Sequence, residues 1–401
     1  MTTTTTAECN YVANFTLKER EHRWGRVRKR MVEEKLDCLI SFPNQGRYEQ
    51  LQANTRYLTQ IGGFATEVCV VFPLDGEVTA LVQSAGDVEF WGLAQNWISK
   101  FRNTQRKWAE GMIAQLKEQK LPPKSRVGVI GLKGLIRAPD GVVPWYMFER
   151  VKEAFPDIEF VNATHVILET RAVKSDEEVG FIQKAEEIAE KAVDSMFAIA
   201  RAGVKENILY SELLRTMLAN GAELPTMIYW VAGNPRLRHI YPVPRPLKVG
   251  DVIANEIEAK YAGYIAQISA PAIVGPITDR LAHLYEKSEE LFNRMLPLML
   301  PGKRAMDVGK DYVEIVQSMG FKHIPWPMHG RGLGDDLPVM QNPLAETDAV
   351  FEENQVLIFK PGMIDPKAPD DDERVGDTVV ITKTGAKRLG KRPLGMTEIP
   401  V

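Results

Sequence analysis

Cysteine is scarce in this sequence of 401 residues: three are present, Cys9, Cys38 and Cys69, with no C-x-x-C spacing. An odd, unpaired set predicts neither a disulfide framework nor a thiolate zinc site, and it fits a protein of the reducing cytoplasm. Long uninterrupted apolar runs are also missing, so we expect no membrane-spanning segment. Five threonines follow Met1 where a signal peptide has a basic patch and an apolar stretch, so we expect no signal peptide.

The chain also lacks an excess of charge of one sign. Lysine and arginine total 50 against 53 aspartates and glutamates, a formal net charge of −3, and no basic run dominates any segment. General attraction to nucleic acid or to a membrane surface is therefore not expected. With 44% hydrophobic and 26% charged residues, the composition is that of an ordinary globular protein, and the length favours two domains.

The first part of the chain predicts an α/β domain over residues 16–170, preceded by a flexible leader over residues 1–15. Apolar positions at helical spacing alternate with short apolar runs along it. The expected helices cover residues 17–35, 108–119 and 143–154, and the expected strands cover residues 36–42, 68–72, 78–82 and 126–130. Pro73-Leu74-Asp75-Gly76 predicts a hairpin turn between two of these strands, because aspartate and glycine tolerate positive φ.

A second domain is predicted over residues 171–401. Ser175 and Glu178 form a capping box before apolar positions that repeat at helical spacing, which predicts a long first helix. Further helices are expected over residues 208–218, 279–299 and 306–318, and strands over residues 227–231, 251–259, 264–274, 355–359 and 377–382. The prolines and acids of residues 365–374 predict a mobile insert.

Two histidines stand in segments that are suited to hold a side chain for chemistry. His239 follows a Gly-Asn-Pro stretch and precedes a proline-rich one, and His329 lies among alternating glycines that let a ligand approach the backbone. Between them, Glu256 and Glu258 are two residues apart, which places both carboxylates on one face of a strand. The other four histidines have no polar neighbours at suggestive spacing, and we expect them to be surface or structural residues.

Together these segments resemble the creatinase, aminopeptidase P, prolidase and methionine aminopeptidase group, whose catalytic domain has the pita-bread fold. The resemblance spans nearly the whole chain and rests on ordered motifs: Arg56-Tyr57-Leu58-Thr59 with Gly63-Phe64, Arg171–Glu178, Gly233–His239, Pro246–Asp251, Ala259–Tyr264 and Pro361-Gly362-Met363. It implies a creatinase-like α/β amino-terminal domain joined to an α+β pita-bread catalytic domain. It also implies a homodimer in which the segment from Arg56 to Phe64 lies near the partner's pocket.

The positions of the family's metal ligands depart from the family's pattern. The metallopeptidases bind two metal ions through two aspartates, one histidine and two glutamates, and the resemblance aligns these ligands with Glu256, Gln267, His329, Lys360 and Gly376. One acid and one histidine remain, and Lys360 places an ammonium where a dication would lie. A dinuclear metal centre is therefore not expected, and no other cofactor is implied.

We therefore expect a metal-independent hydrolase that cleaves a C–N bond in a small polar, carboxylate-bearing substrate. Within the resemblance, creatinase and ectoine hydrolase are precedents for metal-free C–N cleavage, although the active-site glutamates of creatinase fall at Ser269 and Lys360 here. His239 would transfer a proton, with Glu256 as orienting group, base or nucleophile. Lys360 and Arg331 would bind the anionic part of the substrate. The predicted site also includes His329, Glu258, Gln267, Arg56 and Phe64.

Two alternatives stay open on the same residues. A histidine base that faces a lysine and an arginine also suits a lyase or decarboxylase, because it can abstract a proton while the cations stabilise an enolate. A chain with a degraded metal site can instead be a non-catalytic pseudopeptidase that binds a peptide or protein, which the two retained histidines disfavour. The sequence has no long acidic or basic tail of the kind that binds histones or nucleic acid by charge.

Overall fold

The structure is a computed structural model that describes residues 12–43, 53–63, 66–237, 241–325, 327–340, 342–344, 347–367 and 372–401. Two compact units make up the chain, Met1–Arg171 and Ala172–Val401. Phe64 and His239 of the predicted site lie outside the described residues, as do residues 1–11 of the predicted leader and residues 368–371 of the predicted insert. None of the helices in the described part of the chain is long and apolar enough to cross a membrane.

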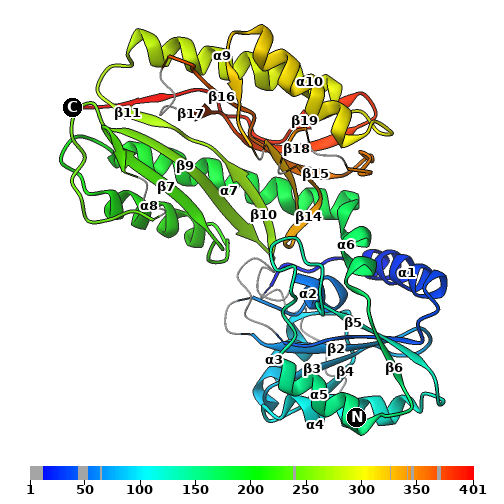
Figure 1. Cartoon of the computed structure of the whole chain (residues 1–401). Helices are drawn as coiled ribbons and strands as arrows, with labels where there is room; N and C mark the ends of the chain where they lie inside the picture. The colour runs from blue at the N-terminus through cyan, green and yellow to red at the C-terminus, as the bar shows by residue number, and fades with distance from the viewer. Residues whose placement is uncertain are drawn as a thin grey trace. The chain divides into compact units, whose positions relative to one another are not determined.

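The first unit is an α/β domain built on one mixed sheet (Figure 1). Its strands are β1 (Cys38–Ser41), β2 (Val68–Pro73), β3 (Thr79–Val82), β4 (Lys100–Asn103), β5 (Arg126–Ile130) and β6 (Glu159–Asn162). Its helices are α1 (Leu17–Glu33), α2 (Ala53–Thr59), α3 (Ala85–Ala94), α4 (Trp108–Gln119), α5 (Trp145–Ala154) and α6 (Thr164–Ala172). The strand order is β4-β3-β2-β1-β5-β6, with β1 antiparallel to β2 and parallel to β5.

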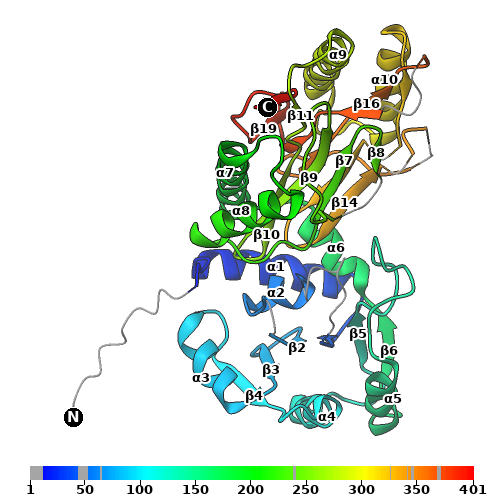
Figure 2. The same cartoon turned by 90° about the vertical axis from the view of Figure 1, so that its left-hand side faces the viewer.

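Helices cover both faces of this sheet. The helices α1 and α2 lie on one face and α4 and α5 on the other (Figures 1 and 2). Ile40, Val71 and Val129 of the strands pack against Met112 and Leu116 of α4, which accounts for the helical spacing of the apolar residues in α4.

The end of the predicted leader belongs to the packed first unit. Phe15 is buried, its ring centroid lies 6.1 Å from that of Trp97, and the guanidinium carbon of Arg23 lies 4.1 Å from the Phe15 ring centroid. The Asn14 side chain also donates a hydrogen bond to the Ala94 carbonyl oxygen at 2.8 Å. The leader prediction is therefore wrong for Asn14 and Phe15, because the aromatic ring finds apolar partners from distant parts of the sequence.

The second unit mixes helices with antiparallel strands. Its helices are α7 (Asp176–Ile199), α8 (Glu206–Ala219), α9 (Asp279–Met295) and α10 (Ala305–Ser318), with the 3₁₀ turn η1 (Leu296–Leu298) after α9. Its strands are β7 (Ile228–Gly233), β8 (Arg236–Leu237), β9 (Val252–Tyr261), β10 (Tyr264–Ile268), β11 (Ala272–Val274), β12 (Lys322–His323), β13 (Met328–Arg331), β14 (Asp335–Met340), β15 (Val356–Phe359), β16 (Gly362–Ile364), β17 (Asp372–Arg374), β18 (Asp377–Thr382), β19 (Gly385–Arg388) and β20 (Thr397–Ile399).

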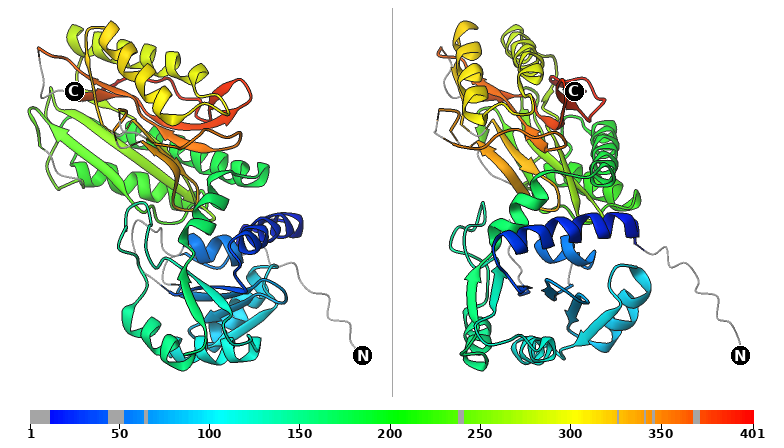
Figure 3. Two further views of the ribbon diagram at one scale, coloured as in Figure 1. Left: turned by 45° about the vertical axis from the view of Figure 1, so that its right-hand side comes forward. Right: turned by 90° about the vertical axis from the view of Figure 1, so that its right-hand side faces the viewer.

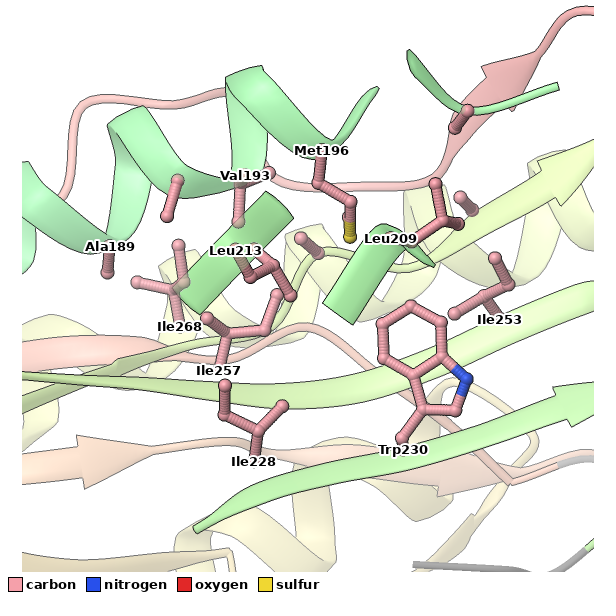
Figure 4. Close-up of a cluster of buried hydrophobic side chains, with 14 of the residues drawn as sticks. Ala189, Val193, Met196, Leu209, Leu213, Ile228, Trp230, Ile253, Ile257 and Ile268 are labelled. Carbon is pink, nitrogen blue, oxygen red and sulfur yellow. The ribbon is translucent and has the colours of Figure 1, made fainter. Parts of the chain in front are cut away.

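Two larger sheets and one small sheet organise these strands. The first has the order β20-β11-β9-β7-β8 with β10 paired to β9, the second has the order β14-β13-β15-β18-β19, and the small one has the order β12-β16-β17. Figure 4 shows apolar side chains of α7 and α8 meeting those of β7, β9 and β10, including Met196, Trp230 and Ile257. A second core lies between α9, α10 and the strands β13, β15 and β18, and the two helices run side by side (Figures 1 and 3).

Three predicted elements of the second unit differ from the structure. The strand expected over residues 264–274 is two strands, because the Asn255 side chain takes the place of a strand neighbour and bonds both the N–H and the carbonyl of Ala270. The helix expected over residues 279–299 ends at Met295, two residues before Pro297. The expected insert ends in strand β17, which pairs with β16.

Candidate active site

Strands β9 and β10 form one wall of the candidate site. Ile253 and Ile257 of β9 are buried in the core toward α7 and α8, so Glu256 and Glu258, at the alternate positions, project from the opposite face of the sheet. Gln267 of β10 is the cross-strand partner of Glu258 and therefore lies on the same face. The structure thus brings three of the predicted site residues together on one strand pair.

Strands β13 and β15 form the second wall. Met328 of β13 and Phe359 of β15 are buried in the core toward α9 and α10. The next residues, His329 and Lys360, therefore project from the other face of this sheet. Arg331 reaches the same side, because its guanidinium forms an ion pair with Glu258 of the first wall.

Lys360 and Glu256 form an ion pair that joins the two walls. Lys360 Nζ lies 2.6 Å from Glu256 Oε1, and the exposed fractions of the two side chains are 8% and 13%. The pair is therefore largely covered by protein, and both side chains keep a small solvent-exposed fraction. In such a setting opposite charges attract each other more strongly than in bulk water.

Arg331 forms a deeper ionic cluster. Its guanidinium donates to the carboxylates of Glu258 and Asp335, and the exposed fractions are 4% for Arg331 and 0% for Glu258. Burial raises the pKa of Glu258, and the charge of the Arg331 guanidinium counteracts that rise. His329 Nδ1 lies 3.7 Å from Asp335 Oδ1, so one aspartate faces both the imidazole and the guanidinium.

These contacts show what two of the predicted residues bind within the chain. Arg331 and Glu258 were expected to contact the substrate, but both are buried and bonded to each other. Their ion pair joins the two walls, and the expected substrate contacts of both residues stay predictions. Asp335 is absent from the sequence analysis, because its contact with Arg331 depends on strand β14, which no sequence pattern predicts.

Gly376 lies beside Lys360 without room for a side chain. A β-carbon at residue 376 would lie 2.7 Å from Ser269 Oγ and 3.0 Å from the Lys360 β-carbon. The backbone is fixed at this point, because Ser269 N donates to the Gly376 carbonyl oxygen at 2.9 Å and Gln267 N donates to Thr378 Oγ1 at 3.0 Å. A glutamate at residue 376 would therefore have to displace its neighbours.

His239 lies outside the described residues, but anchors of the chain that follows it are described. Arg245 donates to Glu206 Oε1 at 2.6 Å and to Asp251 Oδ2 at 2.7 Å. Trp230 Nε1 donates to the other Glu206 oxygen at 2.8 Å. This network ties α8, β7 and the residue before β9 together, and the sequence analysis missed it because its members are far apart in the chain.

Arg56 belongs to α2 of the first unit. Its side chain lies over Gly62, where an added β-carbon would lie 2.8 Å from Arg56 Cδ. The expected contact of Arg56 with a substrate stays a prediction, and so does that of Phe64, which lies outside the described residues.

Two protein-family models match the sequence of this chain. The Creatinase/Prolidase N-terminal domain matches residues 23–173, and Metallopeptidase family M24 matches residues 180–383. The chain belongs to metallopeptidase family M24. Its first unit is thus a creatinase-type amino-terminal domain, and its second unit is an M24 catalytic domain.

Similarities to individual proteins support the assignment of this chain to M24. The Xaa-Pro dipeptidase of Pyrococcus furiosus is 29% identical over 254 residues, which cover 63% of this chain and 72% of that protein. The creatinase of a Bacillus species is 26% identical over 269 residues, which cover 61% of this chain and 64% of that protein. The crystal structure of an X-Pro aminopeptidase from Thermotoga maritima has a TM-score of 0.77 at 20% identity and covers 94% of this chain and 99% of that one. These likenesses confirm the predicted fold, an α/β amino-terminal domain with a pita-bread catalytic domain.

Within the residues that the structure describes, no group of three or more histidine, cysteine, aspartate or glutamate side chains is placed to hold a metal ion. Glu256 is paired with Lys360, and Glu258 is paired with Arg331.

Proposed function

We propose that this M24 hydrolase works without a metal ion and cleaves a C–N bond in a small, carboxylate-bearing molecule. The ion pair of Lys360 and Glu256 carries the proposal, because Lys360 Nζ lies 2.6 Å from Glu256 Oε1. Both residues align with metal ligands of the metallopeptidases. Lys360 stands where those enzymes have an acidic ligand, and its ammonium would lie where they hold a metal ion. A cation is thus supplied by the chain itself.

The chemistry of the available donors also supports metal independence. Gln267 offers an amide where a second aspartate is needed, and Gly376 offers no side chain. Adding a carboxylate at residue 376 is obstructed by Ser269 and by Lys360 itself. The residues present therefore do not fit a dinuclear centre, and no step of the proposed reaction uses one.

The proposed hydrolysis uses the ion pair directly. Glu256 accepts a proton from a water molecule while the water oxygen attacks the electrophilic carbon of the C–N bond. The electron pair displaced onto the substrate's heteroatom is stabilised by the Lys360 ammonium. When the C–N bond breaks, the leaving nitrogen takes a proton from an imidazolium, which we assign to His239 with His329 as the second candidate.

The relatives leave two kinds of substrate to distinguish. One relative is named a dipeptidase and another a creatinase, so both peptide and non-peptide C–N bonds occur among proteins of similar sequence. The loss of the aligned metal ligands supports a non-peptide substrate, because creatinase within the resemblance cleaves a small polar molecule without metal, although creatinase has a glutamate at the position of Lys360. An anionic group on the substrate would be attracted by the ammonium of Lys360.

A substrate screen in labelled water tests the proposal. N-acyl, guanidino, cyclic-amidine and aromatic carboxylic acids would be incubated with the full chain in H₂¹⁸O, with and without excess chelator, beside Xaa-Pro dipeptides. The proposal predicts turnover that survives chelation and a product that carries solvent oxygen. Product without solvent oxygen would instead show a lyase or decarboxylase. Turnover that is lost with chelator and returns with added metal would refute the proposal.

Two substitutions locate the chemistry. His239→Ala and Glu256→Gln are each expected to lower kcat by about 10²–10⁴-fold, the usual effect of losing a positioned acid or base. His283→Ala is the matched control, because His283 is an exposed residue of α9. Full activity in His239→Ala would remove this residue from the mechanism, and a covalent ester trapped on Glu256 would identify it as a nucleophile rather than a base.

A further inference from the structure

Lys174 is buried at the turn between β13 and β14, although it belongs to the segment before α7. Its Nζ lies 2.8 Å from Asp336 Oδ2 and 3.1 Å from the Ala172 carbonyl oxygen, and the exposed fraction of both charged side chains is 1%. Lysine is rarely buried to this degree unless it is paired. The ion pair is therefore a specific contact between two segments that lie 162 residues apart in the sequence.

The turn is shaped to accommodate this pair. A β-carbon on Gly332 would lie 2.6 Å from Asp336 Oδ2 and 3.0 Å from Lys174 Cε, so a residue with a side chain would push the pair aside. The Gly332 carbonyl oxygen accepts a hydrogen bond from Ile265 N of β10 at 3.0 Å. The turn is thus attached both to the strand pair that carries Glu256 and to Lys174.

Two adjacent aspartates extend from this turn to opposite faces of β14. Successive side chains of a strand point to opposite faces. Asp335 faces Arg331 and His329 of the candidate site, whereas Asp336 faces Lys174. Because a single peptide joins the two aspartates, a displacement of Asp336 is transmitted to Asp335.

We propose that Lys174 is a positioning residue of the candidate site, which fixes the start of β14 through Asp336 and thereby aims Asp335 at His329 and Arg331. Replacing a buried ion pair by apolar groups of similar volume is often neutral or stabilising, whereas removing one partner is strongly destabilising. Stability alone therefore does not explain the pair, and the geometry that it imposes on Asp335 does. The consequence for turnover rests on the proposed function, and the consequence for geometry does not.

A paired substitution separates positioning from folding. Lys174→Met with Asp336→Leu removes both charges at similar volume, so the double variant is expected to stay folded in the full chain. Histidine labelled with ¹⁵N reports the imidazole of His329 by its chemical shifts, and His329→Gln identifies the signal. The proposal predicts that the His329 shifts change in the double variant while those of exposed His283 do not.

A matched control uses a second lysine–aspartate pair of the same unit. Lys303 Nζ lies 2.5 Å from Asp311 Oδ2, but the side chains are 29% and 34% exposed. Lys303→Met with Asp311→Leu is expected to leave the His329 shifts as they are in the unmodified chain. Gly332→Ala provides a third variant, because its methyl group displaces the buried pair without removing a charge, and it too is expected to change the His329 shifts.

The outcomes are separable. Unchanged His329 shifts in the folded double variant overturn the proposal, and if that variant fails to fold, unchanged shifts in Gly332→Ala overturn it. With a substrate in hand, the double variant is expected to lose about 10–100-fold in kcat with little change in KM, because misplacing a catalytic group by about 1 Å costs rate of this order. A chain that turns over no substrate but shows the shifts would contradict the proposed function and support the positioning role.

Discussion

Lys360 sets the charge balance of the candidate site. A lysine that lies 2.6 Å from Glu256 neutralises a carboxylate that is more exposed than those of Glu258 and Asp335. The deeper cluster is bonded within itself, because Arg331 binds both Glu258 and Asp335. The ammonium of Lys360 is therefore the cation that we expect an anionic substrate to meet.

Replacing Lys360 tests whether it acts in binding or in the chemical step. Lys360→Met is expected to lower kcat/KM by about 10²–10³-fold. Losses of this size are typical when an enzyme loses a group that stabilises charge developing in the transition state. If Lys360 only holds a carboxylate, KM rises and kcat stays; if it stabilises the transition state, kcat falls and KM changes little. Steady-state kinetics beside Lys303→Met measures both, and an unchanged kcat/KM would exclude either role.

Glu186, on helix α7, shows how burial changes the pKa of a single ionisable group. It is completely buried on α7, and its pKa is raised well above the usual range, first by burial and then by the charge of Asp377. Burial also raises the pKa of Asp377, but Arg388 and the backbone N–H of Thr378 donate hydrogen bonds to its carboxylate and counteract that rise. The surroundings of Glu186 also include Glu190 and Thr378. We therefore assign the proton of this carboxyl pair to Glu186.

This assignment predicts how stability depends on pH. Because the folded chain binds the Glu186 proton more tightly than the unfolded chain does, the contribution to stability is fully present below the ordinary glutamate pKa of about 4.3 and is lost as pH rises through the raised pKa. Glu186→Gln keeps a neutral group at every pH, so its free energy of unfolding should fall less between mildly acidic and alkaline pH. Denaturant titrations at several pH values check this, and identical pH profiles for the two proteins would contradict it.

Gly376, directly before β18, illustrates how packing closes a position that aligns with a metal ligand of the family. Gly376→Ala is expected to lower the melting temperature by several degrees, because a forced core contact costs about 1–3 kcal/mol. Ser269→Ala added to it removes the contact at 2.7 Å and should recover part of the loss. Gly180→Ala, where a β-carbon meets nothing within 4 Å, is the control and should not destabilise. A Gly376→Ala protein as stable as the unmodified chain would contradict the described packing.

Elements with a local pattern could be predicted, and elements defined by their partners could not. The helix expected over residues 108–119 coincides with α4, because Trp108, Met112 and Leu116 repeat at helical spacing and pack on one sheet face. Strand β14 carries two aspartates and Pro338 within Asp335–Met340, so its sequence has no strand pattern. Its pairing with β13 alone makes it a strand.

The same distinction applies to the site. The face of Glu256 and Glu258 follows from their spacing along one strand. Their partners do not, because Lys360 lies 104 residues from Glu256 and Arg331 lies 73 residues from Glu258. The sequence shows that Lys360 and Arg331 are present. Only the pairing of the folded strands determines whether these side chains contact a substrate or a carboxylate of the chain. For this reason the expected contact of Arg331 with a substrate stays a prediction.

At the scale of the whole molecule, we propose a homodimer in which Arg56 of one subunit contributes to the site of the other. Chains carrying Arg56→Ala and chains carrying His239→Ala should each be inactive as homodimers. Mixed dimers of the two should regain one competent site. At equal protein concentration, each mixed dimer should therefore show about half of the activity of an unmodified dimer. A fully active monomer in light scattering and kinetics, or no recovery in mixed dimers, would contradict a shared site.

The central claim is that the chain supplies its own cation in place of metal ions, and its metal content tests this most directly. The purified full-length protein would be equilibrated with excess Mn²⁺ or Zn²⁺, desalted and analysed by elemental mass spectrometry. Because Lys360 pairs with Glu256 and residue 376 has no space for a ligand, the account predicts far less than one metal ion per chain. Two tightly held metal ions per chain would contradict it and restore the metallopeptidase reading.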